Sequence, residues 1–84
     1  MFAYINGILE SIEQNKVVID VNGIGYALTV PSGVIDSLPV KGENLKLHTY
    51  LVIREDAHEI YGFIDTYQKN MFQKLITVSG IGPK

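Results

Sequence analysis

The sequence predicts a mainly β fold, a small five-stranded barrel followed by one α-helix. Three observations support this prediction. Five apolar or alternating runs precede residue 65, an Asn-Gly pair joins two of them, and after residue 65 the apolar period becomes helical. If the five strands formed a flat sheet, a chain of 84 residues could not cover both of its faces and both of its edges. Closing the strands into a barrel removes the edges and makes one core.

The first three strands are expected in the first third of the chain. Residues 2–9 are apolar, with Gly7 as a candidate bend or bulge. Residues 16–22 and 24–30 alternate between apolar and polar side chains, which is typical of half-buried strands. Between them lies Asn22-Gly23, a pair that supplies the two positive φ angles of a type I′ turn. The sequence therefore predicts a hairpin here.

The fourth and fifth strands are expected at residues 45–53 and 58–64, joined by a tip at 54–57. Residues 32–39 between the third and fourth strands suit a loop or a helical turn. If the hairpin turns at the tip, His48 lies opposite residue 62 or 63 and not opposite His58. Without cysteines, the two histidines make a weak metal site, and surface positions are the favoured interpretation.

A helix is predicted over residues 66–77. Asp65 is its expected N-cap and Gln68 the reciprocal partner, a variant of the capping box. Two glycines and a proline at 80–83 must end it. Its apolar residues recur at helical spacing and form a stripe of Tyr67, Met71, Leu75 and Val78, widened by Phe72 and Ile76.

Charge is divided unevenly along the chain. The net charge is −2, but residues 1–65 hold all nine acids and four basic residues, a net of −5, whereas residues 66–84 hold three lysines and no acid. One molecule can therefore attract an anion on one face and repel it on another, although a solvated lysine-bearing tail is the simpler alternative. The absence of cysteine fits a cytoplasmic protein, and neither a signal peptide nor a membrane-spanning run is evident.

The segment SGIGPK at residues 79–84 is a candidate phosphate-binding turn. Gly80 and Gly82 would let the backbone approach an anion, and Pro83 favours the start of a new helix with free N–H groups. Lys84 adds a positive charge. Such binding contacts nucleic-acid phosphates without reading bases. A glycine-rich helix cap without a ligand remains an equally good interpretation.

Glu55 and Asp56 at the expected hairpin tip could suggest paired catalytic carboxylates. However, adjacent residues of an extended strand point to opposite faces, and no third group is evidently placed to orient them. A charged, solvated tip is therefore favoured over catalysis.

These features together resemble the RuvA family, the Holliday-junction-binding subunits of the bacterial RuvAB branch-migration complex. The resemblance covers the whole chain and is carried by IDVNGIGY, LHTYLVIREDA, YGF and VSGIGPK, with Ile53 and Ile81 in place of valine. It implies an OB-fold-like barrel in residues 1–64. It also implies that residues 65–84 begin a helix-hairpin-helix DNA-binding domain.

The resemblance also implies roles for individual residues. Gly80, Gly82 and Lys84 match the first helix-hairpin-helix turn and would contact DNA phosphates, and Arg54 is a further candidate contact. Glu55 and Asp56 match an acidic pin that meets the pins of other subunits at a four-fold axis, where the junction's arms cross. No catalytic residue, metal or cofactor is expected.

The expected partners are four-way junction DNA, three further copies of the chain in a homotetramer, and the RuvB ATPase, which drives branch migration in recombination and repair. The chain ends at Lys84, before the second helix of the first motif. We therefore expect the second motif and the RuvB-contacting domain to be absent from it, and its own DNA binding to be weak.

Two other function classes compete with this interpretation. A generic OB-type module would bind single strands, or mediate assembly only, through exposed rings of Tyr26, Tyr50 or Tyr61. A small hydrolase would use Glu55 or Asp56 and is the least favoured.

Overall fold

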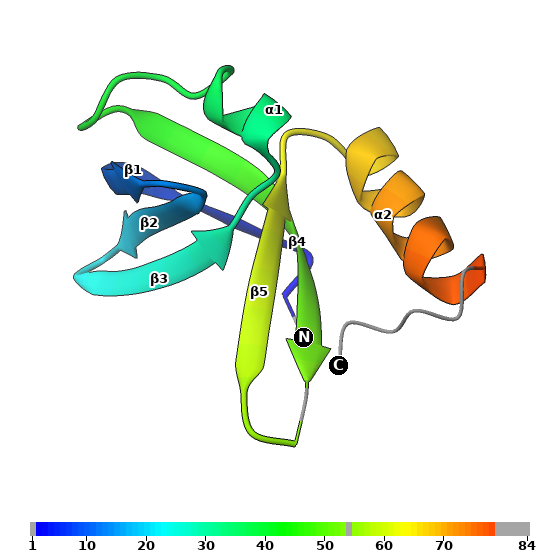
Figure 1. The fold of residues 1–84 in the computed structure, drawn as a ribbon. Coiled ribbons are helices and arrows are strands. Elements are labelled where there is room, and N and C mark those ends of the chain that lie inside the picture. The colour runs from blue at the N-terminus through cyan, green and yellow to red at the C-terminus, as the bar shows by residue number, and fades with distance from the viewer. Residues whose placement is uncertain (1, 54, 79–84) are drawn as a thin grey trace.

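The five expected strands form a closed barrel with the strand order β1-β2-β3-β5-β4, an OB-fold-like arrangement, and a helix follows it (Figure 1). This computed structural model describes residues 2–53 and 55–78, with side chains described up to residue 75. The elements are β1 (Tyr4–Glu13), β2 (Lys16–Val21), β3 (Ile24–Thr29), α1 (Ser32–Ile35), β4 (Asn44–Ile53), β5 (His58–Phe63) and α2 (Thr66–Val78).

Strand β1 is shared between two neighbours. Its first half pairs with β4 and its second half, up to Glu13, pairs with β2, so it is longer than the predicted run of 2–9. The register shift lies between Leu9 and Ser11 and not at Gly7, the expected place for a bulge. Glycine is needed at position 7 for a steric reason, because a Cβ atom there would collide with the backbone oxygen of Asp20 on β2.

The β2–β3 hairpin has the predicted turn. Asn22 and Gly23 have φ angles of 52° and 90°, the positive values that a type I′ turn requires. The N–H of Gly23 donates a hydrogen bond of 2.8 Å to the Asp20 carboxylate. Local chemistry therefore determines this corner of the barrel.

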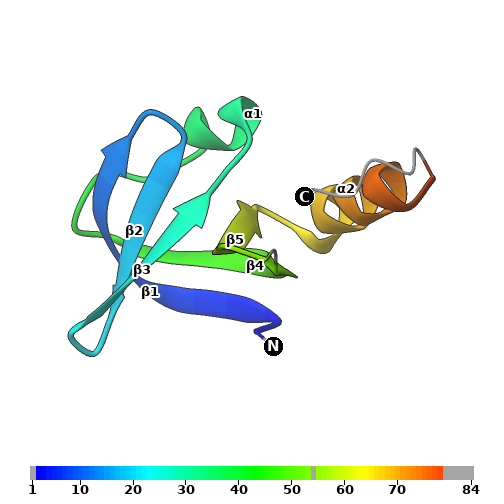
Figure 2. The same ribbon diagram turned by 60° about the horizontal axis from the view of Figure 1, so that its bottom comes forward.

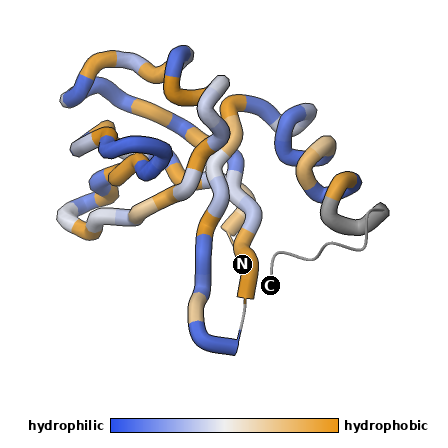
Figure 3. Tube along the Cα trace, viewed as in Figure 1, coloured by the Kyte–Doolittle hydropathy of each residue, from blue (hydrophilic) through white to orange (hydrophobic). Residues whose placement is uncertain are grey.

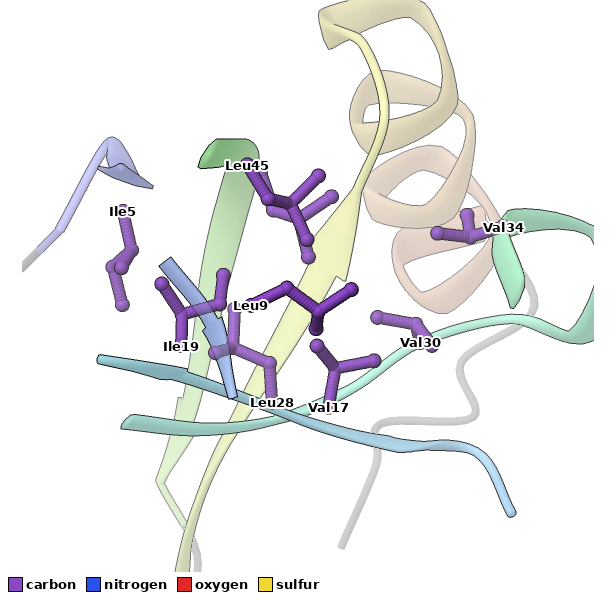
Figure 4. Close-up of a cluster of buried hydrophobic side chains, with 9 residues drawn as sticks. Ile5, Leu9, Val17, Ile19, Leu28, Val30, Val34 and Leu45 are labelled. Carbon is purple, nitrogen blue, oxygen red and sulfur yellow. The ribbon is translucent and has the colours of Figure 1, made fainter. Parts of the chain in front are cut away.

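The core lies inside the barrel, where alternate residues of the strands point inward (Figure 4). The short helix α1 adds Val34, which is fully buried. The buried cluster consists of Ile5, Leu9, Val17, Ile19, Leu28, Val30, Val34, Leu45 and Leu47. Among the side chains that the structure describes, Thr49 is the buried polar one, and its hydroxyl donates a 2.7 Å hydrogen bond to the Phe2 carbonyl.

Helix α2 lies on the outside of the barrel (Figure 2). Its cap is the predicted one: the Gln68 N–H donates to the Asp65 carboxylate at 2.9 Å, and the Gln68 side-chain oxygen accepts from the Ile64 N–H at 3.1 Å. None of the helices in the described part of the chain is long and apolar enough to cross a membrane.

Phe72 is the described member of the α2 apolar stripe that packs on aromatic rings of the barrel. Tyr67, Met71 and Leu75 are 71%, 45% and 63% exposed, while Phe72 contacts rings on β4 and β5. The side chains of the other two predicted members, Ile76 and Val78, lie outside the described residues. The connection from β5 to α2 has only two residues, so it sets the rotation of the helix and turns Phe72 toward the barrel.

Candidate nucleic-acid interface

The β4–β5 hairpin extends beyond the rest of the barrel and carries the acidic tip (Figure 1). Its ladder runs from His48 opposite Phe63, as predicted, to Ile53 opposite His58. Strand β4 pairs with β1 only up to His48, and β5 meets β3 only at Tyr61. Among the described residues, the outer part of the hairpin is therefore a two-stranded ribbon.

Glu55 and Asp56 lie at the end of this ribbon, and both are exposed. Figure 3 shows that the end of the hairpin is hydrophilic. Within residues 2–53 and 55–78, neither carboxylate has a hydrogen-bond or ion-pair partner. Arg54, the predicted DNA contact beside them, lies outside the described residues. The two acids thus form a solvated patch of negative charge on a projecting arm.

The arrangement of the tip suits electrostatic repulsion better than acid–base chemistry. A catalytic carboxylate needs a neighbour that orients it, and no described residue forms a hydrogen bond or ion pair with either acid. An exposed negative charge repels a phosphate within a screening distance of about 8–10 Å at physiological salt. The tip can therefore keep a nucleic-acid backbone away from the end of the hairpin.

The predicted phosphate-binding residues Gly80, Gly82 and Lys84 lie outside the described residues. The described structure includes the helix that leads to them. Of the two lysines on α2, Lys74 is exposed and Lys69 is half-buried. Neither forms an ion pair with another described residue. Helix α2 therefore carries positive charge, whereas the tip is acidic.

The aromatic rings predicted as stacking platforms for bases pack against other aromatic rings of the protein. Tyr26 packs edge-on against Phe2 at 6.0 Å, and Tyr50 and Tyr61 both pack against Phe72. All three tyrosines are half-buried, so none offers the open face that stacking on a base requires.

A different ring, that of Tyr4, is open on the outer face of β1 and β4. Tyr4 is 52% exposed, and the Lys46 amine lies 4.2 Å from the centre of its ring. His48 packs edge-on beside it at 6.5 Å. The strand alternation that buries Ile5 could have indicated that Tyr4 points outward.

Metal chemistry gains no support from the described residues, which contain no cluster of three or more histidine, cysteine or acidic side chains. His48 and His58 lie opposite different residues at the two ends of the β4–β5 ladder, as the register argument predicted.

Comparison with known proteins agrees with this architecture. Residues 1–62 match the family described as the RuvA N terminal domain. Over all 84 residues, the chain is 48% identical to the Holliday junction branch migration complex subunit RuvA of Thermoanaerobacter sp. strain X514. It is 46% identical to the subunit of the same name from Caldanaerobacter subterraneus subsp. tengcongensis, and 44% identical to that of Pseudomonas savastanoi pv. phaseolicola.

The chain spans less than half the length of these curated relatives, 45%, 45% and 42% of them respectively. The family match nevertheless covers most of the 84 residues, including every strand of the barrel except the final residue of β5. The chain therefore belongs to the RuvA family.

Proposed function

We propose that this chain is the N-terminal part of a non-catalytic scaffold that binds four-way DNA junctions for branch migration in recombination and repair. The observation that carries the proposal is the pair of exposed carboxylates at the end of the projecting β4–β5 hairpin, in a chain whose relatives are named as Holliday junction branch migration subunits. Because bacterial chromosomal DNA is the proposed partner, the proposed place of action is the cytoplasm.

In this proposal the hairpin tips of four subunits meet at the crossover of a homotetramer. Eight carboxylates close to one axis would repel the phosphate backbones and keep the strands from settling across the centre. Residues 65–84 would begin a second, DNA-binding domain, in which Gly80, Gly82 and Lys84 hold an arm by its phosphates, with Arg54 as an additional contact. The motor would be a separate ATPase, RuvB, that contacts a later part of the protein.

Neutralising the tip tests this proposal in a protein of the relatives' full length. Glu55→Gln with Asp56→Asn removes two charges per subunit without changing side-chain size. We expect stronger binding to ordinary duplex and a smaller preference for the four-way junction, measured by gel-shift competition. Because exposed charges are screened by salt, the difference from the unmodified protein should shrink as ionic strength rises.

The matched control is Glu10→Gln with Asp36→Asn, the same change of charge at two exposed acids away from the tip. This control should leave the preference for the junction nearly unchanged. An unaltered preference in the tip variant, or an equal change in both variants, would show that the tip does not act by local repulsion.

A second candidate function is the binding of single strands on the barrel's outer face, and the exposed Tyr4 ring beside Lys46 favours it. In that case the 84-residue chain alone should bind a single-stranded oligonucleotide, and Tyr4→Ala should weaken the binding several-fold. A full-length protein that prefers junctions, with Tyr4→Ala neutral, supports the scaffold instead.

A further inference from the structure

Among the described side chains of helix α2, Phe72 makes the aromatic contacts with the barrel. Its ring centre lies 4.9 Å from that of Tyr61, 5.3 Å from that of Phe63 and 5.8 Å from that of Tyr50. These separations are in the range of favourable aromatic pairs. Phe63 is almost completely buried, so Phe72 packs onto a residue that the barrel itself holds firmly.

The rings that receive Phe72 belong to the two strands that carry the acidic tip. Tyr50 and Tyr61 lie directly opposite each other in the β4–β5 ladder. Three residue pairs further along, the ladder ends at Ile53 and His58, a distance of about 10 Å at the usual rise of a strand. The seat of α2 and the acidic tip are therefore parts of one hydrogen-bonded ribbon.

Two points determine the direction of a rigid helix, and α2 has one at its start and one at Phe72. The first is the cap, in which Gln68 bonds to Asp65 and Ile64 immediately after β5. The second lies about 9 Å along the helix axis, at the helical rise of 1.5 Å per residue. The side chains of Tyr67, Met71 and Leu75 border a groove between helix and barrel but stay 71%, 45% and 63% exposed, so they contribute less to the seat than Phe72 does.

The packing around Phe72 leaves open space on both sides of its ring. Two cavities of about 310 Å³ and 280 Å³ flank it, and both have Pro31, Phe63 and Phe72 in their walls. Removing the ring would join the two cavities and take away the central apolar contact between helix and barrel.

We propose that Phe72 is a positioning residue that fixes the direction of α2 relative to the acidic tip of the β4–β5 hairpin. It thereby sets the spacing between the repelling carboxylates and helix α2, which carries Lys69 and Lys74. The consequence for DNA rests on the function proposed above, whereas the geometric part does not. Without Phe72 each DNA-contacting element persists, but the two no longer match the spacing of a junction's crossover and arms.

The geometric part is tested in the 84-residue chain by spin-label distances without DNA. The chain has no cysteine, so Ala57→Cys and Lys74→Cys, both at exposed positions, place one label near the tip and one on α2. We expect a narrow distance distribution that Phe72→Ala broadens or shifts. Phe72→Leu should give an intermediate width, and it keeps the test decisive if the alanine variant folds poorly. Asn70→Ala, at an exposed position on the same helix that lines neither cavity, should leave the distribution unchanged.

The functional part is tested by junction-against-duplex competition in a protein of the relatives' length. Phe72→Ala should lower the preference for the junction several-fold while duplex binding is retained. Phe72→Tyr, which keeps an aromatic ring at this position, should retain the preference. An unchanged distance distribution overturns the proposal, and so does a broadened one with an unchanged preference. Failure of the proposed function would be recognised separately, by a neutral result for the Glu55 and Asp56 variant.

Discussion

At Gly7, β1 lies too close to β2 to leave room for a side chain. A Cβ atom on Gly7 would lie 2.8 Å from the Val21 Cγ2 atom and 2.9 Å from the Ile19 Cγ2 atom, in addition to its collision with the Asp20 carbonyl. A backbone oxygen in a barrel strand cannot move aside cheaply, so even the smallest side chain overpacks this position.

We therefore predict that Gly7→Ala lowers the free energy of unfolding by about 1–3 kcal/mol, the usual range for overpacking. Urea denaturation followed by circular dichroism measures the change. Gly33→Ala is the matched control: its Cβ would have no neighbour within 4 Å, and alanine suits a helix, so it should be neutral or slightly stabilising. Equal losses in both variants would contradict the packing argument.

At the scale of elements, α2 depends on the cap at its first turn. Asp65 accepts a hydrogen bond from the Gln68 N–H, which satisfies one of the free donors at the helix start. The cap also joins the end of β5 to the helix, because the Ile64 N–H donates to Gln68. Loss of the cap should therefore fray α2 and loosen its seat together.

We predict that Asp65→Ala destabilises α2 by about 1 kcal/mol, the typical effect of removing an N-cap. Far-UV circular dichroism should show less helix, while amide hydrogen exchange in the barrel strands stays slow. Asp36→Ala is the control, an exposed aspartate with no side-chain hydrogen bond to a described residue. Comparable loss of helix in the control would remove the cap as the cause.

For the whole molecule, the barrel closes at the β3–β5 seam. There the backbone ladder has a single bridge, Thr29 opposite Tyr61. Glu59 reinforces it: its carboxylate accepts hydrogen bonds from the Thr29 hydroxyl at 2.8 Å and the Tyr61 hydroxyl at 3.1 Å, and lies 3.9 Å from the Lys16 amine. A seam with so few backbone bonds depends on such side-chain contacts.

We predict that Glu59→Ala lowers the free energy of unfolding by about 1–3 kcal/mol, because two hydroxyl groups lose a charged acceptor. Hydrogen exchange should accelerate first in β3 and β5. Glu59→Gln should cost less, since its amide oxygen still accepts a hydrogen bond and the distant Lys16 ion pair contributes little at a partly exposed site. A glutamine variant as unstable as the alanine variant would assign the effect to charge.

Much of the fold follows from local patterns in the sequence. The Asn22-Gly23 turn, the cap at Asp65 and the register that places His48 opposite Phe63 are confirmed. Each depends on backbone preferences or spacing within a few residues, which neighbouring residues alone can satisfy. For the candidate site, the exposed position of Glu55 and Asp56 is confirmed as well. The roles of these acids, and of Arg54, Gly80, Gly82 and Lys84, stay predictions.

The strands, the helix and the charged hairpin tip could be predicted from the sequence alone, because apolar periodicity and turn chemistry are local. The packing of the whole chain was needed to show that Gly7 serves a close approach to Asp20 and that, within the apolar stripe of α2, Phe72 makes the ring contacts with the barrel. An apolar pattern shows that a surface favours burial. Which partner buries it depends on the rotation that the short β5–α2 connection imposes, and this is settled only when helix and barrel pack together.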